Sequence, residues 1–147
     1  MEFLMAQVAE LQALDRAECL RLLRTVSVGR IVFSEQALPA IQPVNFTVEG
    51  SDVFIRTSGG AKLTAAVNGN VVAFEADETD ASTRSGWSVV VLGHASLVRD
   101  IDQLVALAGP RSQPWVPGRS DHVIRIKSER ITGRRIEPGL HDRRTAG

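Results

Sequence analysis

The chain carries at residues 53–67 the stretch VFIRTSGGAKLTAAV, in which a strand-like run passes through two glycines into a helix-compatible segment. The paired glycines let the backbone approach an anion closely, and Ser58 offers a hydroxyl to cap the helix, whose first N–H groups point at the same place. Arg56 and Lys62 add positive charge on either side of the turn. The stretch predicts a phosphate-binding turn, although an ordinary strand-to-helix connection has the same local pattern.

Strand-like runs extend from this turn in both directions. Short β-branched or aromatic segments lie at 26–33, 40–48, 52–57, 71–76, 87–98 and 122–131. Turn-forming residues separate them, and their spacing fits hairpins better than alternating strands and helices. The pattern predicts a mainly β fold, a small six-stranded antiparallel barrel that is closed or partly closed.

Helical spacing of apolar residues marks the N-terminal part of the chain. The first apolar stripe consists of Leu4, Val8, Leu11 and Leu14. After a break, Asp15 and Glu18 form a variant capping box that opens a second short helix reaching Leu23. We therefore expect N-terminal helices within residues 1–24.

Three further segments complete the expected arrangement. Asp100 can cap a helix over 101–107 that stops at Gly109-Pro110. A polar loop is expected at 77–85, and residues 136–147 are expected to form a flexible tail.

Composition favours one domain over residues 1–147. The 15.9 kDa chain is 44% apolar and 23% charged, with 17 basic and 17 acidic residues, which is typical of a soluble globular protein and not of a nucleic-acid binder. A single cysteine, Cys19, excludes an intrachain disulfide. Without a signal sequence or a membrane-spanning stretch, we expect a cytoplasmic protein with no nucleic-acid or membrane partner.

Several phrases occur together and in order along nearly the whole chain: VGR at 28–30, PVNF at 43–46, RTSGGAK at 56–62, FEAD at 74–77, GWSVVVLG at 86–93 and ITGRR at 131–135. With these phrases the chain resembles the pyridoxamine 5′-phosphate oxidase-like proteins, which have an FMN-binding split β-barrel. The resemblance is to small, actinobacterial-type members. Since the chain is shorter than typical pyridoxamine phosphate oxidases, we do not expect vitamin B6 oxidation.

The resemblance implies a homodimer with flavin in a groove at the dimer interface, FMN by preference and FAD as the alternative. A deazaflavin coenzyme is a weaker option. The residues implied in phosphate binding are Arg56, Thr57, Ser58 and Lys62. The segment implied along the flavin ring is Pro43, Val44 and Asn45. The apolar run 89–92 also suggests a strand covered on both faces, with a second subunit on one of them.

Trp87, Ser88 and Trp115 are further candidates for the cofactor site. Trp87 either stacks near the flavin or packs the longest strand, and Ser88 could donate a hydrogen bond to phosphate or ring oxygen. Trp115, in a Pro-bearing loop, is either a lid over the cofactor or a plug in the barrel mouth.

No catalytic residue can be assigned from the sequence. His94 and His122 alternate with apolar residues without ligands at metal spacing, so no metal site is expected. Glu75 and Asp77 are expected on opposite faces of their strand, which argues against a working acid pair. The sequence leaves three functions open: a flavin-dependent oxidoreductase with a small-molecule substrate and a nicotinamide reductant, a flavin store without turnover, and a deazaflavin-dependent reductase.

Overall fold

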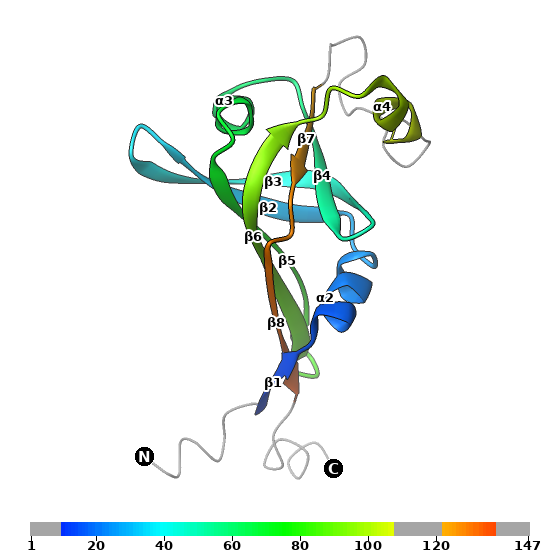
Figure 1. Cartoon of the computed structure of the whole chain (residues 1–147). Helices are drawn as coiled ribbons and strands as arrows, with labels where there is room; N and C mark the ends of the chain where they lie inside the picture. Colours follow the sequence, from blue (N-terminus) through cyan, green and yellow to red (C-terminus); the bar gives the residue numbers. More distant parts are fainter. Residues whose placement is uncertain (1–9, 108–121, 138–147) are drawn as a thin grey trace, which may run out of the picture.

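The computed structural model describes residues 10–107 and 122–137. An eight-stranded antiparallel sheet organises them, in the order β1-β8-β6-β5-β2-β3-β4-β7. Because β6 also pairs with β7, the six strands from β2 to β7 close into a barrel (Figure 1). The predicted mainly β, six-stranded antiparallel barrel is confirmed.

The barrel strands overlap the six predicted runs. They are β2 (Val28–Glu35), β3 (Leu38–Glu49), β4 (Asp52–Thr57), β5 (Val71–Asp80), β6 (Ser85–Leu97) and β7 (His122–Ile126). β5 is longer than predicted, because its pairing with β6 continues to Asp80. The loop expected at 77–85 is therefore only a turn at 81–84, where the Asp80 carboxylate accepts the Ser82 N–H at 2.9 Å.

The final run contains two strands, and the prediction of one strand was wrong. β7 ends at Ile126, and β8 (Arg130–Glu137) begins after a break at residues 127–129. Ser128 is buried in this break, and its N–H donates to the Asp52 carboxylate at 3.0 Å. β8 then pairs with the first half of β6, whereas β7 pairs with its end.

The N-terminal prediction also needs correction. Residues Glu10–Leu14 form β1, an edge strand paired with β8 as far as Glu137, not the end of a helix. The helical spacing of their apolar residues did not produce a helix, because hydrogen bonds to β8 satisfy their backbone groups. Leu11, one residue of the predicted apolar stripe, is 61% exposed and does not pack in the core. Residues 136 and 137 consequently belong to a strand and not to a tail. Leu4, Val8 and residues 138–147 lie outside the described residues.

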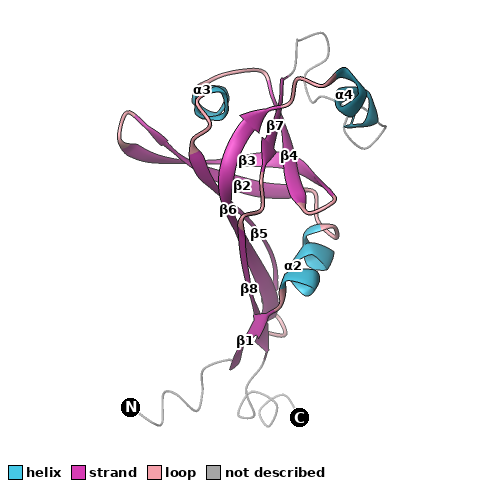
Figure 2. Ribbon diagram, viewed as in Figure 1, coloured by secondary structure: helices cyan, strands magenta, loops and turns pink. Residues whose placement is uncertain are grey.

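In the described parts of the chain, three short helices accompany the sheet: α2 (Arg16–Leu23), α3 (Ala61–Val67) and α4 (Ile101–Leu107). The predicted caps of α2 and α4 are confirmed, since Asp15 accepts the Glu18 N–H at 2.8 Å and Asp100 accepts the Asp102 N–H at 2.8 Å. Figure 2 shows α2 beside the lower strands and α3 at the opposite end of the barrel. The expected helix stop at residues 109–110 lies outside the described part of the chain.

The core fills the barrel and continues under α2. Phe46 and Phe74 meet at its centre edge to face, with ring centroids 4.6 Å apart. Gly93 marks the point where β6 passes closest to the break between β7 and β8, since a Cβ there would lie 1.6 Å from the Lys127 carbonyl oxygen.

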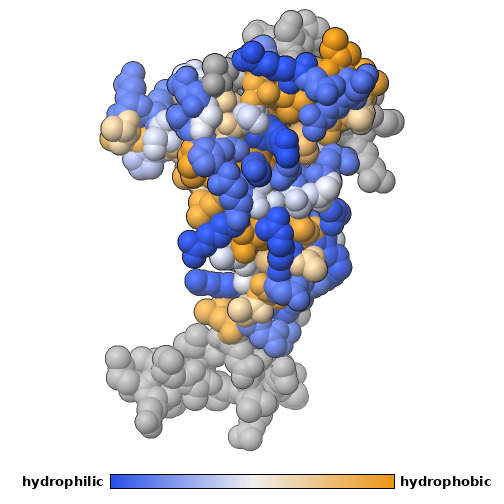
Figure 3. Space-filling view, viewed as in Figure 1, coloured by the Kyte–Doolittle hydropathy of each residue, from blue (hydrophilic) through white to orange (hydrophobic). Residues whose placement is uncertain are grey.

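A smaller apolar cluster packs Phe54 and Val123 against α4. The opposite side of α4 leaves Ile101 and Val105 exposed, at the end of the molecule where Figure 3 shows apolar surface. No helix in the described parts of the chain has the length and apolar character needed to cross a bilayer.

Candidate functional site

The turn between β4 and α3 brings Arg56, Thr57, Ser58 and Lys62 into one continuous segment, residues 56–62, which we call the cradle. Thr57 is buried and organises this turn: its hydroxyl donates to the Gly59 carbonyl at 2.9 Å and lies 3.3 Å from the Gly59 N–H. Gly59 and Gly60 have φ of 140° and 94°, a region that other residues rarely adopt. The sequence of the cradle therefore sets its backbone.

Ser58 does not cap the helix, and that expectation was wrong. α3 begins at Ala61 with Gly60 at the N-cap position, and no side chain makes a cap hydrogen bond there. Ser58 is exposed two residues earlier. The positive φ of the glycines turns the chain after Ser58, so the helix starts later than the sequence pattern suggested.

Lys62 is the half-buried cation of the cradle. Desolvation lowers the pKa of its amine, and it makes no hydrogen bond or ion pair within the described residues. Partial burial of an uncompensated ammonium is unfavourable, and an anion placed beside it would relieve that cost. Arg56 lies half-buried at the end of β4, opposite Val123 of β7.

A second group of candidates lies on the sheet surface opposite the core, which we call the outer face. Cross-strand registers place on it alternate residues of four neighbouring strands. The outer face consists of Val28, Arg30 and Val32 on β2, Ile41, Pro43 and Asn45 on β3, Ala73, Glu75 and Asp77 on β5, and Ser88, Val90 and Leu92 on β6.

Three of the predicted cofactor residues share the outer face: Pro43, Asn45 and Ser88. Val44 and Trp87 do not, because strand alternation turns their side chains toward the core, where they are 7% and 6% exposed. A ligand on the outer face could meet Val44 only through its backbone. Trp115 lies outside the described residues.

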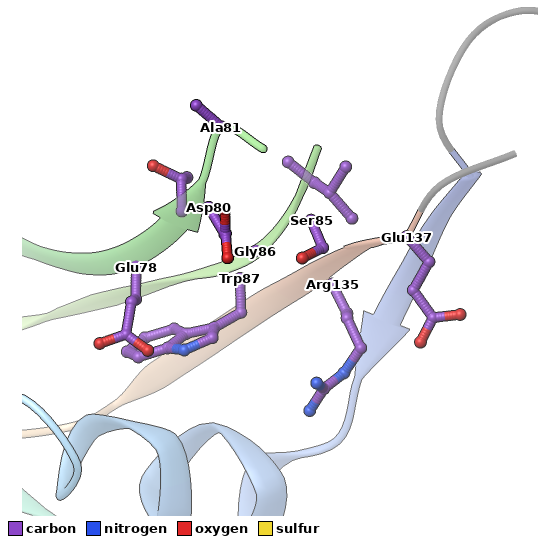
Figure 4. Close-up of a pocket in the computed structure, with 10 residues that line it drawn as sticks. Glu78, Asp80, Ala81, Ser85, Gly86, Trp87, Arg135 and Glu137 are labelled. Carbon is purple, nitrogen blue, oxygen red and sulfur yellow. The ribbon is translucent and has the colours of Figure 1, made fainter. Parts of the chain in front are cut away.

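The Trp87 side chain instead lines a cavity of about 580 Å³ between the β5–β6 turn and β8. Figure 4 shows its indole near Glu78 and on the same side of the sheet as Arg135. Arg135 donates to the Glu18 carboxylate of α2 at 3.0 Å. No residue of the cradle lines this cavity, so the Trp87 indole and the cradle occupy separate places.

The structure reveals one cluster that the sequence reading missed. Glu75 and Asp77 lie on the same face of β5, not on opposite faces, because residues two apart in a strand point the same way. Arg30 of β2 lies 3.1 Å from the Glu75 carboxylate and 3.6 Å from that of Asp77, so one guanidinium contacts both acids. The sequence FEAD at residues 74–77 already indicated this pair, because Glu75 and Asp77 are two residues apart in a strand and therefore share one face.

The two histidines in the described part of the chain, His94 and His122, take part in no metal cluster there. His94 lies 2.7 Å from the Glu129 carboxylate, and this contact lowers the pKa of Glu129. Within residues 10–107 and 122–137, no group of three or more His, Cys, Asp or Glu residues is placed to hold a metal ion.

Known proteins resemble this chain in sequence and in fold. The family model described as pyridoxamine 5′-phosphate oxidase matches residues 15–135. An uncharacterized protein of Mycobacterium tuberculosis, Rv0080, is 47% identical over 132 residues, which are 86% of each chain. Both the cradle and the outer face lie within the family match.

Solved structures agree. The FAD binding protein from Mycobacterium smegmatis has a TM-score of 0.75 and 38% identity, covering 87% of this chain and 100% of its own. A conserved protein of unknown function from Corynebacterium diphtheriae has a TM-score of 0.70 and 32% identity, covering 86% of this chain and 98% of its own. The chain belongs to the pyridoxamine 5′-phosphate oxidase family.

Proposed function

We propose that this chain is a homodimeric flavin-binding protein that acts as an oxidoreductase on small molecules. The observation that carries the proposal is Lys62, a half-buried amine without an ion-pair partner in the described structure, beside a glycine turn with fixed positive φ. This is the arrangement that a phosphate would complete. The relative from Mycobacterium smegmatis, named as an FAD binding protein, supports flavin as the source of that phosphate.

In this proposal the cradle binds the flavin phosphate. Lys62 and Arg56 provide charge-assisted hydrogen bonds, while Thr57 keeps the turn in shape and Ser58 offers an exposed hydroxyl. The residues fit the group chemically, because a phosphate carries the negative charge that the Lys62 amine lacks nearby. Binding should therefore raise the lowered pKa of Lys62.

The ring of the flavin would lie along β3. Pro43 is exposed there and Asn45 is half-buried, and the Asn45 amide offers both a donor and an acceptor to a ring edge. Bound flavin would supply the hydride and electron transfer. The part of this chain is to hold the ring, exclude water from it and fix its orientation.

The homodimer would form through the outer face. Val28 and Ile41 are 48% and 63% exposed in the single chain, and Val90 and Leu92 of the longest strand are half-buried. Such an apolar strand surface favours a covering partner. A second copy would supply it and would bring the Ser88 of each subunit into the interface.

The identity of the flavin is a question for experiment. The family resemblance implies FMN by preference, whereas the relative named as an FAD binding protein makes FAD the first flavin to test. The cytoplasmic location remains a prediction.

The test is to purify the protein and record its visible spectrum before and after addition of FMN and FAD. The proposal predicts oxidised-flavin bands and tight binding of at least one flavin. Stopped-flow mixing with NADH or NADPH then distinguishes an enzyme from a store, since only the enzyme is reduced and reoxidised in cycles. A colourless protein that ignores both flavins but binds a deazaflavin would favour the alternative reductase.

A further inference from the structure

Three charged groups lie together at the centre of the outer face. Arg30 contacts the carboxyl group of Glu75 at 3.1 Å and that of Asp77 at 3.6 Å. Two ionised carboxylates beside one guanidinium leave the cluster with one unbalanced negative charge. A single proton on the pair makes the cluster neutral.

The charge of this cluster depends on that proton. With the proton bound, one negative charge on the pair balances the guanidinium of Arg30, and the cluster is neutral. Burial first, then the hydrogen bond and charge of Asp77, raise the pKa of Glu75 to about 7, while Arg30 opposes the shift. The side chains are still 26% exposed for Glu75 and 37% for Asp77 in the single chain.

Among residues 10–107 and 122–137, few other charged groups surround the pair. On β2 only Arg30 faces it, between Val28 and Val32, and the nearest outer-face residues of β6 are Ser88 and Val90, which carry no charge. The charged groups farther away on this side of the sheet are His94 at the end of β6, and Arg130 and Arg134 of β8, opposite Leu92 and Ser88. The exposed rim of the pair is therefore largely apolar.

We propose that a proton on Glu75, within the cluster that Glu75 and Asp77 form with Arg30, is required for the outer face to close against a second copy of this chain. The inference rests on the proposed homodimer and adds its regulation. Covering the cluster removes the remaining water, and an unbalanced charge is costly in a dry interface whereas the neutral, protonated cluster is tolerated.

The sign of the pH dependence follows from linkage. Desolvation in the dimer raises the proton affinity of the pair above its value in the monomer, so association takes up protons at neutral pH. Raising the pH through the range in which the monomer loses the proton must then weaken the dimer. With one cluster in each copy, the dimer dissociation constant should increase at least about tenfold between pH 7 and pH 9.

Sedimentation velocity of the full-length purified protein over a concentration series, at pH 6, 7, 8 and 9, measures this constant. Wild type should be dimeric at pH 6 and dissociate more readily at each higher pH. Glu75→Gln keeps a hydrogen-bonding side chain and fixes the cluster in its neutral charge state, so its dissociation constant should not change with pH. His94→Gln, which removes the titratable imidazole farther along this side of β6, should keep the wild-type pH dependence.

A wild-type dimer whose affinity does not change with pH would overturn this inference and leave the homodimer standing. A wild-type monomer at every pH would overturn both. Wild-type pH dependence in Glu75→Gln would also overturn the inference, and Asp77→Asn, which has the same net charge, decides the question if Glu75→Gln does not fold. Dilution calorimetry at pH 7.5 in phosphate and in Tris gives an independent readout. Protons released when the dimer dissociates are taken up by the buffer, and the two buffers bind protons with different enthalpies, so the two heats of dilution should differ.

Discussion

The cradle and the outer face treat charge in opposite ways. In the cradle, the half-buried amine of Lys62 has no anionic partner among the described residues. On the outer face, Arg30 contacts two carboxyl groups, and one proton on these carboxyl groups makes the cluster of three side chains neutral. The charge of Lys62 is thus balanced only by an anion from outside the chain, whereas the charge of Arg30 is balanced by carboxyl groups of the same chain. We therefore expect the cradle to contribute to phosphate binding and the outer face to respond to pH.

Removing the positive charges of the cradle should have the largest effect. Arg56→Ala together with Lys62→Ala should weaken flavin binding by roughly 3 kcal/mol, or more than a hundredfold, because two charge-assisted contacts to phosphate are lost. Quenching of flavin fluorescence on titration with protein measures the affinity.

Lys127→Ala is the matched control for this variant. Lys127 is the second lysine of the chain and lies exposed in the break between β7 and β8. Its removal should leave flavin affinity unchanged. If wild type and the double variant bind flavin with equal affinity, the cradle does not bind the flavin phosphate.

The next effect concerns the outer face and the stability of the fold. The folded-state pKa of Glu75, about 7, lies above its ordinary value of 4.5, so folding retains a proton that the unfolded chain releases. This difference costs stability progressively as pH rises from about 4.5 to 7. We expect roughly 1 to 2 kcal/mol after allowance for solvent screening.

Urea unfolding of wild type and Glu75→Gln across this pH range checks the prediction. The stability difference should shift in favour of the variant as pH rises, and then level off above pH 7. A difference that stays constant with pH would show that Glu75 titrates normally.

A smaller effect separates the shape of the cradle from its charge. Thr57→Val preserves the volume of a buried side chain but removes the hydroxyl that holds Gly59. Loosening the turn should weaken flavin binding about tenfold, the equivalent of one hydrogen bond. Isothermal titration calorimetry measures the loss. Unchanged affinity would mean that the glycines alone maintain the turn.

The smallest effect should leave both regions untouched. Asp15→Ala removes the cap of α2, away from the cradle and the outer face, and should cost about 1 kcal/mol of stability. Thermal unfolding measures that cost, while flavin affinity and the pH dependence of assembly should stay at wild-type values. A change in either would indicate coupling that the structure does not explain.

The turn that forms the cradle could be predicted because its residues are contiguous in sequence. Arg56 to Lys62 form one turn, and their residue types carry the signal of their backbone. The first residue of α3 could not be predicted in the same way. It depends on the positive φ of Gly60, which occupies the N-cap position that the sequence pattern suggested for Ser58.

The outer face could be predicted only in part because it is assembled across strands. Arg30 and Glu75 are far apart in sequence and become partners through the register of β2 and β5. The same reason explains β1, whose helical spacing is overridden by pairing with β8. Six barrel strands followed from local patterns, whereas edge pairing and cross-strand charge clusters required the fold.

Titration of the purified, flavin-free protein with FAD and FMN, in parallel with the Arg56→Ala, Lys62→Ala double variant, tests the central claim most directly. The account predicts that wild type binds at least one flavin tightly and that the folded variant binds it more than a hundredfold more weakly. Failure of wild type to bind either flavin would contradict the account.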